Sequence, residues 1–223
     1  MNETMDLNRY LEYAPRIFVD EKEPIPFRYV GCSKYTQGES SRSFRRAYDL
    51  PSVSPDTCDV LEYAYYMDYD IQHLYELEHV WVYRDKEGAV TGAEGSCHGK
   101  YWNAMIPGVT VLEGNHVCMY AQPGKHAMAA DPRYFQLMPG RQDACNRLAG
   151  TGGLDAPAQY VKDISLTPEE NERVKEYIRR HFSFEPAWQF REACIEPDIY
   201  LPWQELQEKI PQLLREELGR ILT

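Results

Sequence analysis

Four ionisable side chains lie just before and within a strongly apolar strand pattern that ends at residue 83. They are Asp70, His73, Glu76 and Glu78. Successive side chains of an extended strand point to opposite faces, so Glu76 and Glu78 share one face. Two carboxylates about 6.6 Å apart on one face repel each other unless a divalent metal or a shared proton lies between them. We therefore predict a metal site formed by these four residues.

The ligand types leave the identity of the metal open. One imidazole with two carboxylates suits Zn²⁺, Mn²⁺ or Fe²⁺, whereas added carbonyl and water oxygens favour Ca²⁺ or Mg²⁺. The alternative interpretation needs no metal. In it, Glu76 lies at a sheet edge and pairs with an arginine, while His73 is simply solvated.

Two further histidines follow strand patterns, each beside a lysine and a glycine. His98 is followed by Gly99-Lys100, and His126 is preceded by Gly124-Lys125. Strand ends of a sandwich cluster in space, so His98 and His126 are candidate acid and base catalysts, with Lys100 as a third candidate. The alternative is a pair of loop histidines that share no site.

A candidate substrate-binding group comes from residues 40–48, which we predict as a short helix. This segment brings together Arg42, Arg45 and Arg46 in an otherwise acidic chain. The group is either a solvated helix face or a clamp for a carboxylate or phosphate, and a clamp must face the same cleft as the acidic strand. Tyr101 is either a core or rim aromatic or a stacking platform for a carbohydrate.

Short strand patterns separated by Gly and Pro occupy the first 160 residues. The turn Asp85-Lys86-Glu87-Gly88 suits an antiparallel hairpin between 77–84 and 89–94. Successive short strands without long helices predict a mainly β protein with an antiparallel β-sandwich. The expected strands are 16–19, 27–32, 60–67, 77–84, 89–93, 109–112 and 116–121.

Helical periodicity replaces the strand patterns near residue 163. Thr167-Pro168-Glu169-Glu170 is a capping sequence that predicts a helix over 168–181. A second amphipathic helix is predicted over 202–222. We therefore expect a β-sandwich domain over 1–163 and a helical extension over 164–223, α+β overall, with the extension packed on the sandwich or on a second copy as a homo-oligomer interface.

The charge balance excludes several classes of partner. The 223 residues include 24 Lys and Arg against 35 Asp and Glu, a net charge of −11. Such a chain repels nucleic acid and anionic lipid surfaces, so neither is an expected partner. It has no run of about 18 apolar residues, no signal-peptide pattern at its start, and six cysteines scattered singly. We expect a cytoplasmic protein with reduced thiols.

Residues 72–83 resemble two related families. The first is the necrosis- and ethylene-inducing-like proteins, with the signature G-H-R-H-D-W-E before an apolar strand, and the second is the vacuolar-sorting-associated family, with a similar D-W-E-H strand. The matching letters here are Gln72-His73-Leu74-Tyr75-Glu76-Leu77-Glu78, and the blocks 13–21, 95–100 and 124–127 resemble the second family. The resemblance implies a β-sandwich with a divalent cation at its rim, held by His73, Glu76 and Glu78. Proteins of the first family bind sphingolipid head groups.

Three functions are compatible with these patterns. The first is a metal-dependent enzyme, of hydrolase, lyase or isomerase type, that acts on a small polar or anionic substrate at the sandwich rim. The second is a non-catalytic, cation-dependent protein that binds a sugar or a lipid head group. The third is a structural or oligomerisation protein, in which 164–223 forms the interface.

Overall fold

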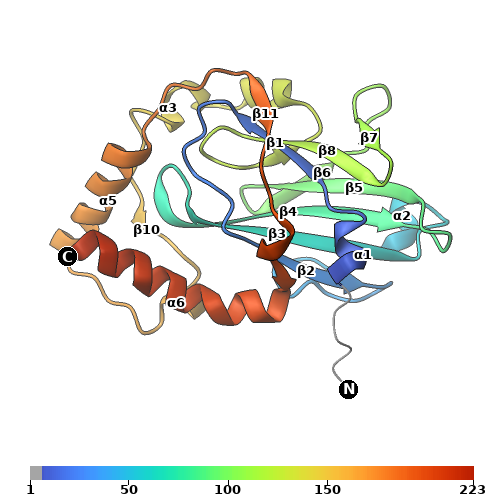
Figure 1. The fold of residues 1–223 in the computed structure, drawn as a ribbon, viewed down its shortest axis with the longest axis horizontal. Coiled ribbons are helices and arrows are strands. Elements are labelled where there is room, and N and C mark those ends of the chain that lie inside the picture. Colours follow the sequence, from blue (N-terminus) through green and yellow to red (C-terminus); the bar gives the residue numbers. More distant parts are fainter. Residues whose placement is uncertain (1–6) are drawn as a thin grey trace.

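Two β-sheets packed face to face form the body of the molecule, as the computed structural model shows for residues 7–223 (Figure 1). One sheet has the order β11-β1-β8-β7, with β9 beside β8, and the other has the order β12-β2-β3-β4-β5-β6, with β10 beside β4. The first contains β1 (Arg16–Asp20), β7 (Leu112–Glu113), β8 (His116–Ala121), β9 (Met128–Ala129) and β11 (Phe190–Glu192). The second contains β2 (Tyr29–Tyr35), β3 (Asp59–Tyr69), β4 (His73–Arg84), β5 (Val90–Cys97), β6 (Lys100–Asn103), β10 (Gly153–Leu154) and β12 (Tyr200–Pro202).

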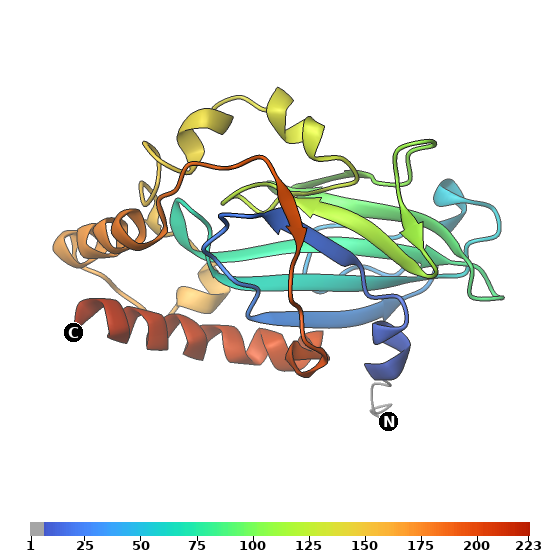
Figure 2. The same ribbon diagram turned by 45° about the horizontal axis from the view of Figure 1, so that its top comes forward.

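Helices lie around one end and one outer face of the sheets. The longest, α6, runs along the second sheet, and α5 lies at the end where β3 turns into β4 (Figure 2). The α-helices are α1 (Leu7–Leu11), α2 (Leu50–Val53), α3 (Arg141–Ala144), α4 (Ala158–Val161), α5 (Pro168–Phe182) and α6 (Trp203–Leu222), and the 3-10 helices are Pro132–Leu137 and Pro197–Ile199. The expected mainly β sandwich with C-terminal helices is confirmed.

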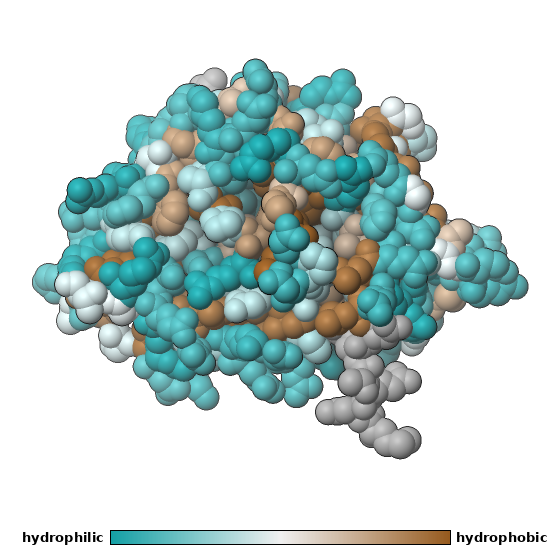
Figure 3. All heavy atoms as spheres, viewed as in Figure 1, coloured by the Kyte–Doolittle hydropathy of each residue, from teal (hydrophilic) through white to brown (hydrophobic). Residues whose placement is uncertain are grey.

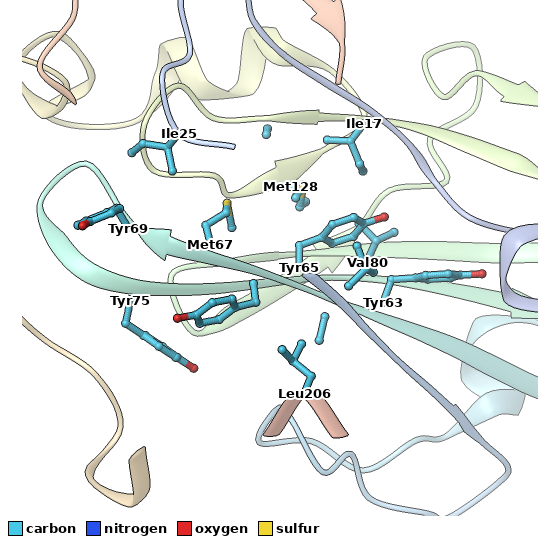
Figure 4. Close-up of a cluster of buried hydrophobic side chains, with 14 of the residues drawn as sticks. Ile17, Ile25, Tyr63, Tyr65, Met67, Tyr69, Tyr75, Val80, Met128 and Leu206 are labelled. Atoms are coloured by element: carbon cyan, nitrogen blue, oxygen red, sulfur yellow. The ribbon is translucent and has the colours of Figure 1, made fainter. Parts of the chain in front are cut away.

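The long β3–β4 hairpin divides the interior into two faces. Side chains alternate along both strands, so the register that pairs Tyr63 with Val80 puts both on the inner face. Met67 also points inward, toward Ile17 and Met128 of the other sheet, whereas Leu206 of α6 lies on the opposite side (Figure 4). The two faces therefore carry separate sets of side chains.

The last part of the chain is built into both sheets. β11 pairs antiparallel with β1, and β12 pairs parallel with β2. β1 with β8 and β10 with β4 are also parallel, so the sheets are mixed where the sequence predicted antiparallel pairing alone. α6 packs closely on β2, since a Cβ on Gly31 would lie 2.9 Å from Leu206 Cδ2. Residues 164–223 thus supply strands as well as helices.

The two predicted C-terminal helices are present. α5 begins with the expected capping box, in which the Thr167 side chain accepts from Glu170 N and the Glu170 side chain accepts from Thr167 N. α6 is continuous through Pro211 and buries one face on the sandwich. The apolar stripe of α6 is therefore covered by the protein's own core.

The helix predicted over 40–48 is wrong. These residues form a bent loop with a single bridge between Ser40 and Ala47. The Ser41 hydroxyl accepts from the backbone N–H groups of residues 43 and 44, at 3.1 and 2.9 Å. Such local side-chain bonds compete with helical ones, so the loop instead folds over the outer face of the second sheet.

The surface is largely hydrophilic on the face seen in Figure 3, in keeping with the net charge of −11. Brown, apolar residues appear there as separated patches. Within residues 7–223, no helix is long and apolar enough to cross a membrane.

Candidate functional site

The β3–β4 turn is held from two sides by other parts of the chain. Ile71 N donates to Gly124 O at 2.7 Å, which ties the turn to the loop after β8. Gly150 N donates to Ile71 O at 2.9 Å and Gly152 N to Gln72 O at 2.8 Å, which tie it to the segment before β10. A Cβ on Gly152 would lie 3.0 Å from the His73 Cβ, so the approach is close. The turn is therefore fixed in place.

An acidic cluster forms where this turn meets the inner face of β4. Glu76 and Glu78 stand opposite Met67 and Tyr65 of β3, at the end of the sandwich. Glu78 is buried and Glu76 is half-buried. Throughout, the acidic cluster means Asp70, Glu76 and Glu78.

Asp70 has a lysine as its counter-ion. Its side chain is fully buried, and the Lys125 ammonium lies 2.5 Å from Asp70 Oδ2. His73 Nε2 is 3.8 Å from Asp70 Oδ1, and Gln72 N donates to that same oxygen at 2.6 Å. Burial alone would raise the pKa of Asp70, but Lys125 and His73 hold it below its usual range. Asp70 is therefore a charged, partnered carboxylate.

Glu76 and Glu78 are far less well compensated. Burial raises the pKa of Glu78 to about 7, although Ser96 Oγ and His98 N (3.3 Å) donate to its carboxylate. The pKa of Glu76 is raised well above its usual range by burial, and then by the charges of Glu78 and Asp70. Both glutamates are therefore protonated more readily than an exposed glutamate, and each would be stabilised in its charged form by a nearby cation.

The candidate histidines do meet at this end of the sandwich. His98 N contacts Glu78, and the His98 ring nitrogen Nε2 lies 3.3 Å from Gln122 Oε1. Burial and the nearby lysine lower the pKa of His98. His126 is fully buried, with Nε2 3.5 Å from Glu23 Oε1. His98 therefore lies at the surface of the site and His126 beneath it.

Unusual backbone and unpaired atoms gather in the same place. Four non-glycine residues between 7 and 223 have positive φ, and three of them border the site: Tyr75 (93°), His98 (48°) and His126 (55°). Both ring nitrogens of His126, and Nδ1 of His73, are buried without a hydrogen-bond partner. Strained backbone and unsatisfied polar atoms tend to concentrate at functional sites.

A second buried glutamate shows the opposite behaviour. Glu62 is fully buried on the outer face of β3, and sequence inspection passed over it. Burial would raise the pKa of Glu62, but the neighbouring His79 imidazole and several hydroxyl donors lower it overall. Its donors are Tyr35, Ser41, Ser43, Tyr48 and Trp81, at 2.6–3.2 Å. Both carboxylate oxygens of Glu62 therefore accept hydrogen bonds from several side chains, whereas Glu76 and Glu78 have fewer donors.

The predicted arginine clamp does not face the acidic cluster. Arg46 lies on the outer face of the sheet, where its guanidinium is 2.6 Å from Glu94 and 3.8 Å from the Tyr101 ring. Arg42 and Arg45 are exposed on the same loop. The prediction was wrong because the loop packs on Glu62, and the sheet itself separates these arginines from the cluster. Tyr101 is 45% exposed, and its ring stacks on the Arg46 guanidinium.

The sequence suggested Lys100 as the functional lysine, but Lys125 is the lysine that lies in the site. Lys100 is exposed at the start of β6, directly after the β5–β6 turn. Lys125, noted only as a neighbour of His126, is the cation of the site. Positive φ at Gly124 (66°) and at His126 turns this loop so that Lys125 points to Asp70. The motif Gly124-Lys125-His126 is the sequence feature from which the role of Lys125 could have been predicted.

The four predicted metal ligands lie at the same end of the sandwich, and Asp70 and His73 are in contact. Among the described residues, no three His, Cys, Asp or Glu side chains converge as metal ligands do. The nearest substitute for an ion is the Lys125 ammonium on Asp70. The metal stays a prediction.

Comparisons with known proteins return fold neighbours alone. No protein-family model matches the chain, and no curated protein matches it. Among solved structures, necrosis and ethylene inducing protein 2 from the causal agent of cocoa's witches' broom disease is 17% identical, with a TM-score of 0.35, over 58% of this chain and 69% of that one. NLPPya in complex with glucosamine is 16% identical, with a TM-score of 0.39, over 72% of this chain and 89% of that one.

A third structure, NLPPya in complex with mannosamine, is 16% identical, with a TM-score of 0.38, over 73% of this chain and 90% of that one. These neighbours agree with the first family named in the sequence comparison. The vacuolar-sorting-associated part of that resemblance has no support from them. No residue of this chain takes a role from these structures.

Proposed function

We propose that this chain is a non-catalytic binding protein for a small hydroxylated ligand that carries a positive charge, and that the acidic cluster binds it. One observation carries the proposal. Three carboxylates share the end of the sandwich with one lysine, which pairs with Asp70, and neither Glu76 nor Glu78 forms an ion pair with any residue from 7 to 223. A ligand ammonium near Glu76 and Glu78 would supply that charge.

The surroundings suit a polar ligand. His98 and half-buried Glu76 reach solvent, while Gln122 supplies an amide beside the His98 ring. These groups donate to and accept from hydroxyls. The buried ring nitrogens of His126, which have no hydrogen-bond partner, add polar atoms behind the cluster. A hydroxylated ammonium compound, such as an amino sugar, combines both kinds of contact.

Binding is favoured over catalysis by the same geometry. His126, the expected proton carrier, is fully buried against Glu23. Lys100, the other expected catalytic group, is exposed at the start of β6. The groups that reach the ligand position hold charge and hydrogen bonds, and that is sufficient for recognition.

The test is calorimetric titration at pH 7 with glucosamine as the probe and glucose as the matched control without an amine. We expect glucosamine to bind and glucose to bind more weakly by about tenfold or more, the value of one charge-assisted hydrogen bond. Ethanolamine tests the ammonium without the sugar ring. Since a bound ammonium would lower the raised pKa of Glu78, protons should be released on binding, which two buffers of different ionisation enthalpy will reveal.

Glu78→Gln is the matched variant, because it removes the charge and keeps the shape. It should lose the preference for glucosamine over glucose. Separate titrations with Mg²⁺, Ca²⁺ and Zn²⁺, and glucosamine titrations with and without EDTA, show whether a metal takes the same place. Equal binding of glucose and glucosamine, or unchanged binding by Glu78→Gln, would overturn the proposal.

A further inference from the structure

A cavity of about 290 Å³ lies at the opposite end of the β3–β4 hairpin from the acidic cluster. It is formed where α1, the end of β2, the start of β3 and the β4–β5 turn meet. Glu78 stands opposite Tyr65, six residues along β3 from Asp59, so the two places are roughly 20 Å or more apart along the strand. The cavity is therefore independent of the function proposed above.

Cationic side chains outnumber carboxylates in its lining, although the chain as a whole carries a charge of −11. The cations are Arg9, Lys34, Arg84 and Lys86, and the carboxylates are Asp59, Asp85 and Glu87. A concave site lined by an excess of one sign concentrates its field there. The cavity is thus a local exception to the charge of the molecule.

The principal carboxylate in the cavity already has its partners. Arg84 donates to Asp59 through Nε and Nη2, at 2.9 and 2.8 Å, and Lys34 Nζ is 3.5 Å from the same carboxylate. Arg84 also lies 4.5 Å from the Tyr13 ring centroid, and the Tyr13 hydroxyl donates to Gly88 O at 2.9 Å. These bonds fix the wall of the cavity and neutralise Asp59.

The other two carboxylates are also engaged. The Asp85 side chain accepts from Ala89 N at 2.8 Å within the turn, and Glu87 lies 3.6 Å from Lys86 Nζ. The guanidinium of Arg9, by contrast, forms no ion pair with any residue from 7 to 223. Arg9 is therefore the lining cation without an ion pair among residues 7–223, and half-exposed Lys34, whose contact with Asp59 is the longer one of 3.5 Å, is the second candidate to meet an anion.

We propose that this cavity binds a small oxyanion of the phosphate type. A phosphate or phosphomonoester fits the volume, can accept from several cations at once, and matches the forked guanidinium of Arg9 better than a halide does. The ligand is either free phosphate or the phosphoryl group of a small metabolite. Both share the chemistry that Arg9 and Lys34 recognise.

The exposed thiol of Cys58 lines the same cavity and provides a reporter of occupancy. In a Cys194→Ser background, which removes the other exposed thiol, N-ethylmaleimide labelling of Cys58 is followed by intact mass. Bound anion should slow the labelling by the factor 1 + [L]/Kd, about elevenfold at ten times Kd. Inorganic phosphate, glycerol phosphate and sodium chloride at matched ionic strength are compared.

Arg9→Met is the principal variant, because Arg9 forms no ion pair with the described residues 7–223 that the substitution would break. It should bind phosphate about tenfold more weakly, and Lys34→Met should act in the same direction. Lys162→Met, an exposed lysine elsewhere, removes the same charge and should leave protection unchanged. Protection by glycerol phosphate but not by inorganic phosphate assigns the site to a larger ligand. Equal protection by chloride, no protection by either phosphate, or full protection in Arg9→Met would overturn the proposal.

Discussion

Glu78→Gln should make the protein more stable above pH 7, although it removes a residue of the proposed site. The pKa of Glu78 is about 7 in the folded chain against an ordinary value of 4.5. Between these values the folded state binds more protons than the unfolded state, so the free energy of unfolding falls as pH rises. Above pH 7 the charged carboxylate costs about 3 kcal/mol, at about 1.4 kcal/mol per pH unit. Glutamine avoids this cost.

The expected gain is smaller than the full electrostatic cost. Glutamine keeps an oxygen for His98 N but loses the charge that strengthens the bond from Ser96, which offsets about 1 kcal/mol. We therefore expect Glu78→Gln to raise the free energy of unfolding by about 2 kcal/mol at pH 8 and by almost nothing at pH 4. For a domain of this size, that corresponds to about 4–8 °C in Tm.

The assay is urea denaturation of both proteins from pH 4 to 8.5. Glu62→Gln is the matched control, since it makes the same chemical change at a buried glutamate of the same hairpin. The pKa of Glu62 is lowered, so its charged form stabilises the fold above the ordinary value, and this contribution is lost as pH falls. Glu62→Gln should cost about 2 kcal/mol or more at pH 7. A Glu78→Gln protein no more stable than wild type at pH 8, or a gain that does not change with pH, would refute the reasoning.

Three further changes test other contacts. Lys125→Met should cost about 3 kcal/mol in urea denaturation, because buried Asp70 loses its partner, while Lys125→Arg should retain most of the stability. Thr167→Ala removes the capping box of α5 and should cost about 1 kcal/mol by the same method, and wild-type stability would contradict it. Gly150→Ala should lower Tm more than Gly38→Ala: both have positive φ, but only a Cβ on Gly150 meets a backbone carbonyl, at 2.1 Å, and equal losses would argue against this contact.

Local sequence patterns were sufficient to predict the β4–β5 hairpin and the two C-terminal helices, α5 and α6. The alternation around Glu76 and Glu78 predicted that both lie on one face, and the capping sequence at Thr167 predicted where α5 begins. Each of these signals depends on residues within one or two turns or strand repeats. Such short-range rules can be applied without knowing the rest of the fold.

The features that could not be predicted from the sequence depend on contacts between residues far apart in the chain. Residues 40–48 form a loop because Glu62, some 20 residues later, accepts from the Ser41 and Ser43 hydroxyls. Lys125 reaches Asp70 because the loop after β8 is hydrogen-bonded to the β3–β4 turn. Neither contact leaves a periodic signal. The periodic patterns of the sequence therefore did not indicate that Lys125 would be the counter-ion of Asp70.

The late position of β11 and β12 affects how the protein can fold during synthesis. Each covers the edge of a strand made near the start of the chain, β1 and β2 respectively. At about 5–20 residues per second, β2 is translated on the order of 10 s or more before β12. The nascent chain therefore carries open strand edges on both sheets for that time, a state prone to pairing with other chains. This topology therefore requires that the open strand edges of the growing chain be protected, for example by chaperones, until β11 and β12 are made.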